Sequence, residues 1–195
     1  MLNYPLDMSF KILAINPQVR VTDASGQLVA YVKQKAFRLK EDITIFADEG
    51  QTQPLYRMNA NRILDFNAAY NITTPYGQPI GQVRRPGLRS IWKANYPISD
   101  PGGNDLGVIH EENAWVKVMD ALLGEVPVLG IFSGYLFNPA YLVDVRGQTA
   151  LYLKKQPAFL EGKFRVEQRG PLYEQDEPLV ISSIIMALML ERMRG

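Results

Sequence analysis

The residues best suited to bind an anion lie together in one short stretch, from Arg84 to Lys93. It carries four positive charges within ten residues, on Arg84, Arg85, Arg89 and Lys93, and it also contains Trp92. A guanidinium group can form two parallel hydrogen bonds to a phosphate, and an indole ring is suited to the interface between lipid and water. The stretch therefore predicts a site for an anionic head group. The alternative interpretation is a solvated loop between two hairpins, with Trp92 pointing into the core.

A second basic run contains Lys33, Lys35, Arg38 and Lys40. Side chains two residues apart in a strand point to the same face, so Lys33 and Lys35 would lie side by side. Charged residues on a strand edge protect it from pairing with another chain. We interpret this run as an ordinary solvated face.

Groups for catalysis are scarce in this chain. His110 is the one histidine, and no His-Glu-x-x-His motif supplies a second imidazole for zinc. Ser133 stands one residue out of register from a Gly-x-Ser-x-Gly motif, and there is no cysteine. Because no nucleophile, base and orienting group can be assembled, we expect no catalytic residues and no enzyme activity.

Metal and cofactor sites are not predicted either. Glu174, Asp176 and Glu177 precede an apolar run, where acids are explained by the dipole of a helix N-terminus. The glycine-containing segments 77–81 and 102–107 match neither a phosphate-binding loop nor a dinucleotide fingerprint, and we interpret them as turns. We expect no metal and no cofactor.

The composition restricts the partners of the chain. Twenty-one Lys and Arg residues stand against twenty Asp and Glu residues, so no overall positive charge attracts nucleic acid. At 195 residues the chain is long enough for one sizeable core, and we expect a single domain over residues 1–195. The absence of cysteine fits a reducing cytoplasm, and the first residues, 1–7, show no secretion or myristoylation signal.

The elements that must position these residues are mainly β-strands. Short apolar or alternating runs are separated by turn residues, and pairs of runs flank a glycine that allows a hairpin turn. The turn glycines are Gly26, Gly50, Gly77, Gly103 and Gly147. With further strands at 132–136 and 163–169, the pattern predicts about twelve strands.

Two helices are expected beside the strands. One lies near 113–123, where Asn113 can cap a helix and Gly124 can end it. The other covers Leu179 to Leu190, a run that is apolar around its whole circumference except for two serines. This run falls short of the about 20 apolar residues of a membrane span, so we expect no transmembrane segment. A barrel of about twelve strands is too wide to fill itself with side chains. We therefore predict a mainly β (α+β) fold, a closed antiparallel barrel around a buried hydrophobic C-terminal helix.

Three segments resemble a known family. Residues 76–83 (Tyr-Gly-Gln-Pro-Ile-Gly-Gln-Val) are similar to a hairpin of the phospholipid scramblases, and residues 90–98 and 105–109 are similar to the strand pair that follows it. On these segments the chain is identified as a member of the tubby C-terminal-like superfamily, which includes the scramblases and the LURP-one-related proteins. The resemblance implies a barrel around a central helix and contact with lipid head groups. Calcium-driven scrambling is not implied, because basic residues interleave with the acids at 160–169.

Two hypotheses of function follow. The first is a non-enzymatic cytoplasmic binding module, peripheral at a membrane, that contacts anionic phospholipid or a phosphorylated head group through Arg84, Arg85, Arg89, Trp92 and Lys93. The second is a soluble regulatory or protein–protein interaction scaffold without a lipid ligand. Neither hypothesis includes nucleic acid or a transmembrane span.

Overall fold

The computed structural model describes residues 1–11, 18–33, 42–60, 69–85, 95–112, 140–158 and 161–192. Within these ranges the chain forms twelve strands and one helix, α3 (Glu177–Arg192). The strands are β1 (Leu6–Lys11), β2 (Gln18–Thr22), β3 (Leu28–Lys33), β4 (Ile43–Phe46), β5 (Pro54–Ala60), β6 (Ala69–Thr73), β7 (Pro79–Arg84), β8 (Asn95–Ser99), β9 (Asp105–Glu111), β10 (Ala140–Val145), β11 (Gln148–Gln156) and β12 (Glu161–Gln168). The helix expected near 113–123 and the strand expected at 132–136 lie outside the described residues.

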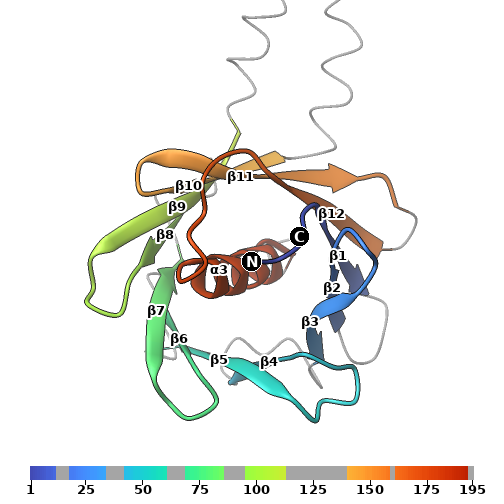
Figure 1. Cartoon of the computed structure of the whole chain (residues 1–195), viewed down its shortest axis with the longest axis horizontal. Coiled ribbons are helices and arrows are strands. Elements are labelled where there is room, and N and C mark those ends of the chain that lie inside the picture. Colours follow the sequence, from blue (N-terminus) through green and yellow to red (C-terminus); the bar gives the residue numbers. More distant parts are fainter. Residues whose placement is uncertain are drawn as a thin grey trace, which may run out of the picture.

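The strands form one closed antiparallel barrel (Figure 1). Each strand pairs with its neighbours in sequence, and β1 also pairs with β12, with Leu6 opposite Val166 and Met8 opposite Phe164. The predicted mainly β class and the closed antiparallel barrel of twelve strands are confirmed.

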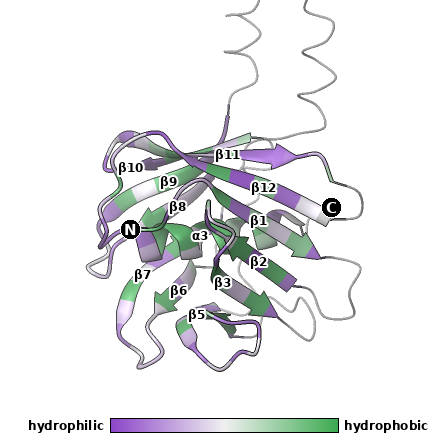
Figure 2. Cartoon of the chain, turned by 45° about the vertical axis from the view of Figure 1, so that its right-hand side comes forward, coloured by the Kyte–Doolittle hydropathy of each residue, from purple (hydrophilic) through white to green (hydrophobic). Residues whose placement is uncertain are grey.

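The period-two pattern of each strand decides which side chains point into the barrel. On β1, Leu6, Met8 and Phe10 are buried, whereas Asp7 and Lys11 are exposed. Figure 2 shows the same alternation of apolar and polar residues along other strands. The inner faces of the strands therefore supply an apolar wall.

Five tight turns join β2–β3, β4–β5, β6–β7, β8–β9 and β10–β11, at the five predicted glycines. Because the strands alternate in direction, these turns lie at one end of the barrel, here called the turn end. In three of them an aspartate accepts main-chain N–H groups from across the turn: Asp23 from Ser25 and Gln27, Asp48 from Thr52 and Gln53, and Asp100 from Asn104. Hydrogen bonds from Ser25, Thr52 and Asn104, respectively, lower the pKa values of the three carboxyl groups.

The helix α3 runs inside the ring of strands (Figure 1). From Leu179 to Leu190 no residue is more than 6% exposed. The helix packs closely against β7, where a Cβ atom added to Gly81 would lie 2.5 Å from Leu179 Cδ2. Within the described part of the chain, no helix is long and apolar enough to cross a membrane.

The wall of the barrel is not paired equally all the way round. Most neighbouring strands share four to six residue pairs, but β7 and β8 share two, and β3 and β4 share the single pair Tyr31 and Phe46 among the residues described. Among the described residues, the boundary between β3 and β4 is therefore the most sparsely paired part of the wall.

Candidate functional site

The structure places two of the five predicted head-group residues. Arg84 is the last residue of β7 and is exposed, and its Nη2 donates a hydrogen bond of 3.4 Å to Ser99 Oγ on β8. Arg85 follows it and is partly buried near Tyr70. Burial raises the pKa of the Tyr70 phenol, and the positive charge of Arg85 acts in the opposite direction. Neither arginine forms an ion pair with a described carboxylate. Arg89, Trp92 and Lys93 lie outside the described residues.

The two ends of the barrel differ in charge. Arg84 and Arg85 lie at the end opposite to the turn end, where the ends of other strands carry the basic residues Lys11, Lys33, Lys154, Lys155 and Lys163 at or within three positions of the strand terminus. The acids Asp42, Glu111, Glu112 and Glu161 lie at that end too. At the turn end the turns carry mostly acids, namely Asp23, Asp48, Glu49, Asp100, Glu174, Asp176 and Glu177, beside Arg146 and Arg169. The basic residues therefore gather away from the turn end.

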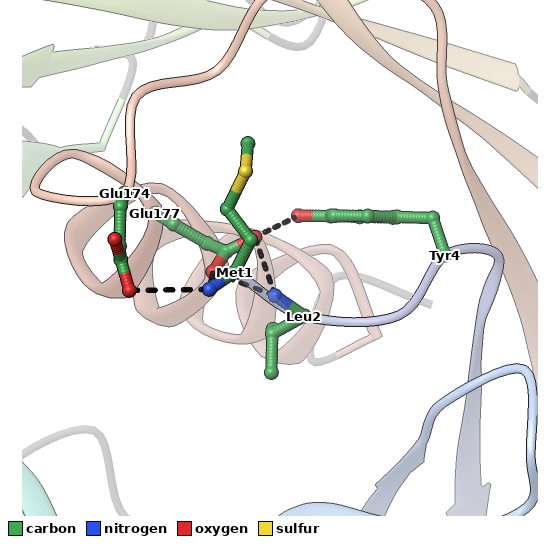
Figure 3. A network of polar contacts seen from close by, with 5 residues as sticks. All are labelled: Met1, Leu2, Tyr4, Glu174 and Glu177. Carbon is green, nitrogen blue, oxygen red and sulfur yellow. Dashed lines mark hydrogen bonds and ion pairs between the residues drawn. The ribbon is translucent and has the colours of Figure 1, made fainter.

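The first turn of α3 is held at the turn end by a polar network (Figure 3). Glu177 is 6% exposed, and its carboxylate accepts the main-chain N–H of Leu2, at 2.9 and 3.1 Å, and the hydroxyl of Tyr4, at 3.1 Å. The amino group of Met1 lies 3.3 Å from Glu174 Oε1. Glu177 thus fastens the chain ahead of β1 to the start of the helix.

Asp176, the neighbouring acid, has a different partner. Arg146, in the turn between β10 and β11, donates from Nε at 2.9 Å and from Nη2 at 3.2 Å to its two carboxylate oxygens. The sequence pattern assigned Glu174, Asp176 and Glu177 jointly to the dipole of the helix. Asp176 and Glu177 also each join α3 to a separate segment of the barrel, whereas Glu174 and Glu177 both lie near the amino group of Met1, at 3.3 and 4.0 Å.

A cavity of about 420 Å³ lies beside this network, between α3 and the strands β3, β4 and β5. It is lined by one face of the helix, Pro178, Ile181, Ser182 and Ile185, by strand and turn residues, Gln27, Leu28, Val29, Ala30, Ile45, Ala47, Leu55 and Tyr56, and by Met1, Leu2, Glu174 and Glu177. Most of the lining side chains are apolar. The cavity therefore lies behind the sparsely paired boundary of β3 and β4.

Comparisons with known proteins bear on the family and the fold. The family model described as LURP-one-related matches residues 28–124, about half of the chain. The chain belongs to the LURP-one-related family. An X-ray structure of a protein from Arabidopsis thaliana has a similar fold, with a TM-score of 0.54 and 13% sequence identity over 97% of this chain and 93% of that one. No curated protein matches the sequence.

This membership confirms the predicted resemblance to the LURP-one-related proteins. The matched region contains residues 76–83, which form part of the turn between β6 and β7 and most of β7. The relation to the scramblases stays a prediction. At 13% identity the Arabidopsis structure supports the fold of this LURP-one-related protein alone.

The one histidine of this LURP-one-related protein lies on the outer wall of the barrel. Nε2 of His110 is 2.9 Å from Asp144 Oδ2, and the other oxygen of Asp144 accepts the hydroxyl of Thr149 at 2.7 Å. The hydroxyl is thus directed at the carboxylate rather than at the imidazole, which is not the arrangement of a nucleophile and its base. Among the described residues no group of three His, Cys, Asp or Glu could hold a metal ion. Ser133 lies outside them.

Tyr4 connects the polar network to the stability of the protein at high pH. Burial, and then the charge and hydrogen bond of Glu177, raise the pKa of Tyr4 above its usual value of 10.0. In the unfolded chain the phenol ionises near pH 10, so its contribution to stability is fully present below pH 10 and is lost as the pH rises further. We expect the free energy of unfolding, measured with urea, to fall between about pH 9 and about pH 11. Tyr4→Phe should make this fall less steep.

The control for this prediction is Tyr76→Phe, because Tyr76 is 93% exposed. It should leave the pH dependence unchanged. The raised pKa values of Tyr31, Tyr56 and Tyr70 act in the same direction, so Tyr4→Phe removes only part of the fall. An unaltered slope in Tyr4→Phe would contradict the assignment.

Proposed function

We propose that this LURP-one-related protein is a non-enzymatic binding module that contacts anionic membrane lipid through the basic residues around Arg84 and Arg85. The observation that carries the proposal is the exposed Arg84 with Arg85 beside it, neither paired with a described carboxylate, at the barrel end away from the acidic turns. An unpaired guanidinium keeps its donors available for phosphate oxygens. Arg89, Trp92 and Lys93, four to eight positions further on, would extend the same contact.

The barrel serves in this proposal as a rigid carrier. About twelve strands enclose more space than their own side chains fill, and we infer that α3 is the core around which residues 1–195 fold as one domain. The complete burial of Val180, Ile184 and Ile185 supports this role. A scaffold of this kind holds its basic end in one geometry at the cytoplasmic face of a membrane.

The test is co-sedimentation with vesicles of phosphatidylcholine alone and of phosphatidylcholine with phosphatidylserine. We expect binding to the anionic vesicles only, weakened by salt. Because each basic residue near an anionic surface contributes about 1 kcal/mol, Arg84→Glu with Arg85→Glu should weaken binding at least about thirtyfold. The matched control is Arg57→Glu with Arg165→Glu, which changes the net charge equally on exposed positions of β5 and β12.

Two outcomes would reject this function. One is the absence of binding to either vesicle, and the other is equal weakening by the two double variants, which would indicate net charge rather than a site. A protein partner that is retained without any lipid would select the alternative, a protein–protein interaction scaffold.

A further inference from the structure

The cavity beside α3 has the size and lining of a ligand pocket. Its volume of about 420 Å³ lies within the range of small-molecule sites, roughly 300–1,000 Å³. Ile45, Ile181 and Ile185 form its inner part and are 6% exposed or less. A space of this kind favours an apolar group, because water inside it would find few hydrogen-bond partners.

The shape of the pocket follows from the helix. Pro178, Ile181, Ser182 and Ile185 recur at helical spacing and form one stripe along α3 that faces β3, β4 and β5. This stripe is about 10 Å long at the rise of an α-helix. A space of that length between a helix and a sheet can hold an extended hydrocarbon chain such as an octyl group.

An entry to the pocket exists at the turn end. Leu28, Val29 and Leu55 line it and are only partly buried, and Met1 and Glu174 at its mouth are exposed. Among the described residues β3 and β4 share a single residue pair, so few of the hydrogen bonds described there would have to break if the wall widened. A chain can therefore enter from the turn end without the barrel opening elsewhere.

The charges at the mouth select the polar end of the ligand. The described residues that line the pocket carry two carboxylates, Glu174 and Glu177, and one positive charge, the amino group of Met1, which lies 3.3 Å from Glu174 and 4.0 Å from Glu177. The mouth keeps a net negative charge, so a carboxylate or phosphate head would be repelled there, whereas a protonated amine could replace the Met1 amino group on these oxygens. The acids of the neighbouring turns, Asp23, Asp48 and Glu49, have the same sign.

We propose that the pocket binds a single-chain amphiphile, with the hydrocarbon chain between α3 and β3–β5 and a protonated amine head at Glu174 and Glu177. The site lies at the end of the barrel opposite Arg84, and its ligand has the opposite charge to the anionic lipid proposed there. The two proposals therefore stand on different residues.

The experiment compares three probes that share one tail: octylamine, octanol and octanoate. Each is titrated by calorimetry at neutral pH, below its micellar concentration, into the full chain without vesicles. We expect one site per chain, with octylamine bound at least about tenfold more tightly than octanoate and with octanol between them.

Two pairs of variants place the binding in the pocket. Ala47→Phe fills the lining next to β4 and should weaken octylamine binding at least about tenfold, whereas Ala24→Phe, on an exposed turn residue outside the lining, should not. Glu174→Gln should narrow the preference for the amine over the alcohol, whereas Asp105→Asn, an exposed acid at the same end, should leave it unchanged. Ala47→Leu replaces Ala47→Phe if thermal melting shows that the larger side chain prevents folding.

Several results would overturn the proposal: no binding of any probe, octanoate binding as tightly as octylamine, or full binding by the filled variants. Self-association that buries Leu28 and Leu55 and excludes the probes would also do so, since a second copy would then be the occupant. None of these outcomes depends on vesicle binding. Loss of the vesicle interaction in the Arg84 and Arg85 variant should leave octylamine binding intact.

Discussion

Replacement of Ile184 by aspartate is expected to prevent this protein from folding. Ile184 is 0% exposed in the middle of α3. Removing its side chain forfeits about 1.5–3 kcal/mol of burial, and an unpaired carboxylate in an apolar core costs several kcal/mol more. Together these effects approach the whole stability of a typical domain, roughly 5–15 kcal/mol.

The measurement is circular dichroism and size-exclusion chromatography of the purified variant. Ile184→Asp should show no cooperative melting transition, and Ile184→Ala should fold with a stability reduced by about 2–5 kcal/mol. Tyr76→Asp introduces the same charge at a position that is 93% exposed and should melt like the wild type. A cooperative transition in Ile184→Asp within a few degrees of wild type would mean that α3 does not form the core.

The five hairpins of this protein could be predicted because their signals are local, whereas β1 was not predicted. A turn with a glycine at positive φ, such as Gly26 or Gly147, together with alternating residues on both sides, specifies a hairpin within about twenty residues. The closure of the barrel was also predictable, since a run as apolar as 179–190 needs a wall around it. The helix expected near 113–123 lies outside the described residues, and the sequence alone supports it.

The candidate sites were harder to predict because they depend on contacts between distant parts of the chain. The pocket is lined by residues from β3, β4, β5 and α3. Two of them, Ile45 and Ile181, are more than 120 positions apart in the sequence. It lies behind the boundary where β3 and β4 share one residue pair among the described residues, and no motif in either strand signals this. Glu177 likewise contacts Leu2 and Tyr4, whereas the sequence offered only its place at the start of a helix. Arg84 and Arg85 could be chosen as candidate binding residues from the sequence, because a cluster of positive charges within a few consecutive residues can be read directly from it.

Gly81 lies in the hairpin that resembles the family. After Ile184→Asp, the addition of a methyl group at Gly81 is expected to reduce the stability of the protein most. Its φ of +146° is rarely adopted by other residues, and it lies on β7 where α3 packs closely against the wall. A Cβ atom there would be 2.5 Å from both Leu179 Cδ2 and the carbonyl oxygen of Ser99. The glycine therefore allows the helix and β8 to pack against β7 at the same point.

We expect Gly81→Ala to destabilise the protein by about 2–5 kcal/mol, the sum of an unfavourable backbone conformation and a displaced helix. Gly77→Ala in the same hairpin is the matched control, because Gly77 also has a positive φ, of +85°, but a Cβ atom there would have no neighbour within 4 Å. It should cost only about 1–2 kcal/mol. Urea unfolding of both variants measures the difference. Equal losses would mean that the backbone conformation alone requires glycine at position 81, and a larger loss at Gly81 would show that the close approach of α3 and β8 also requires it.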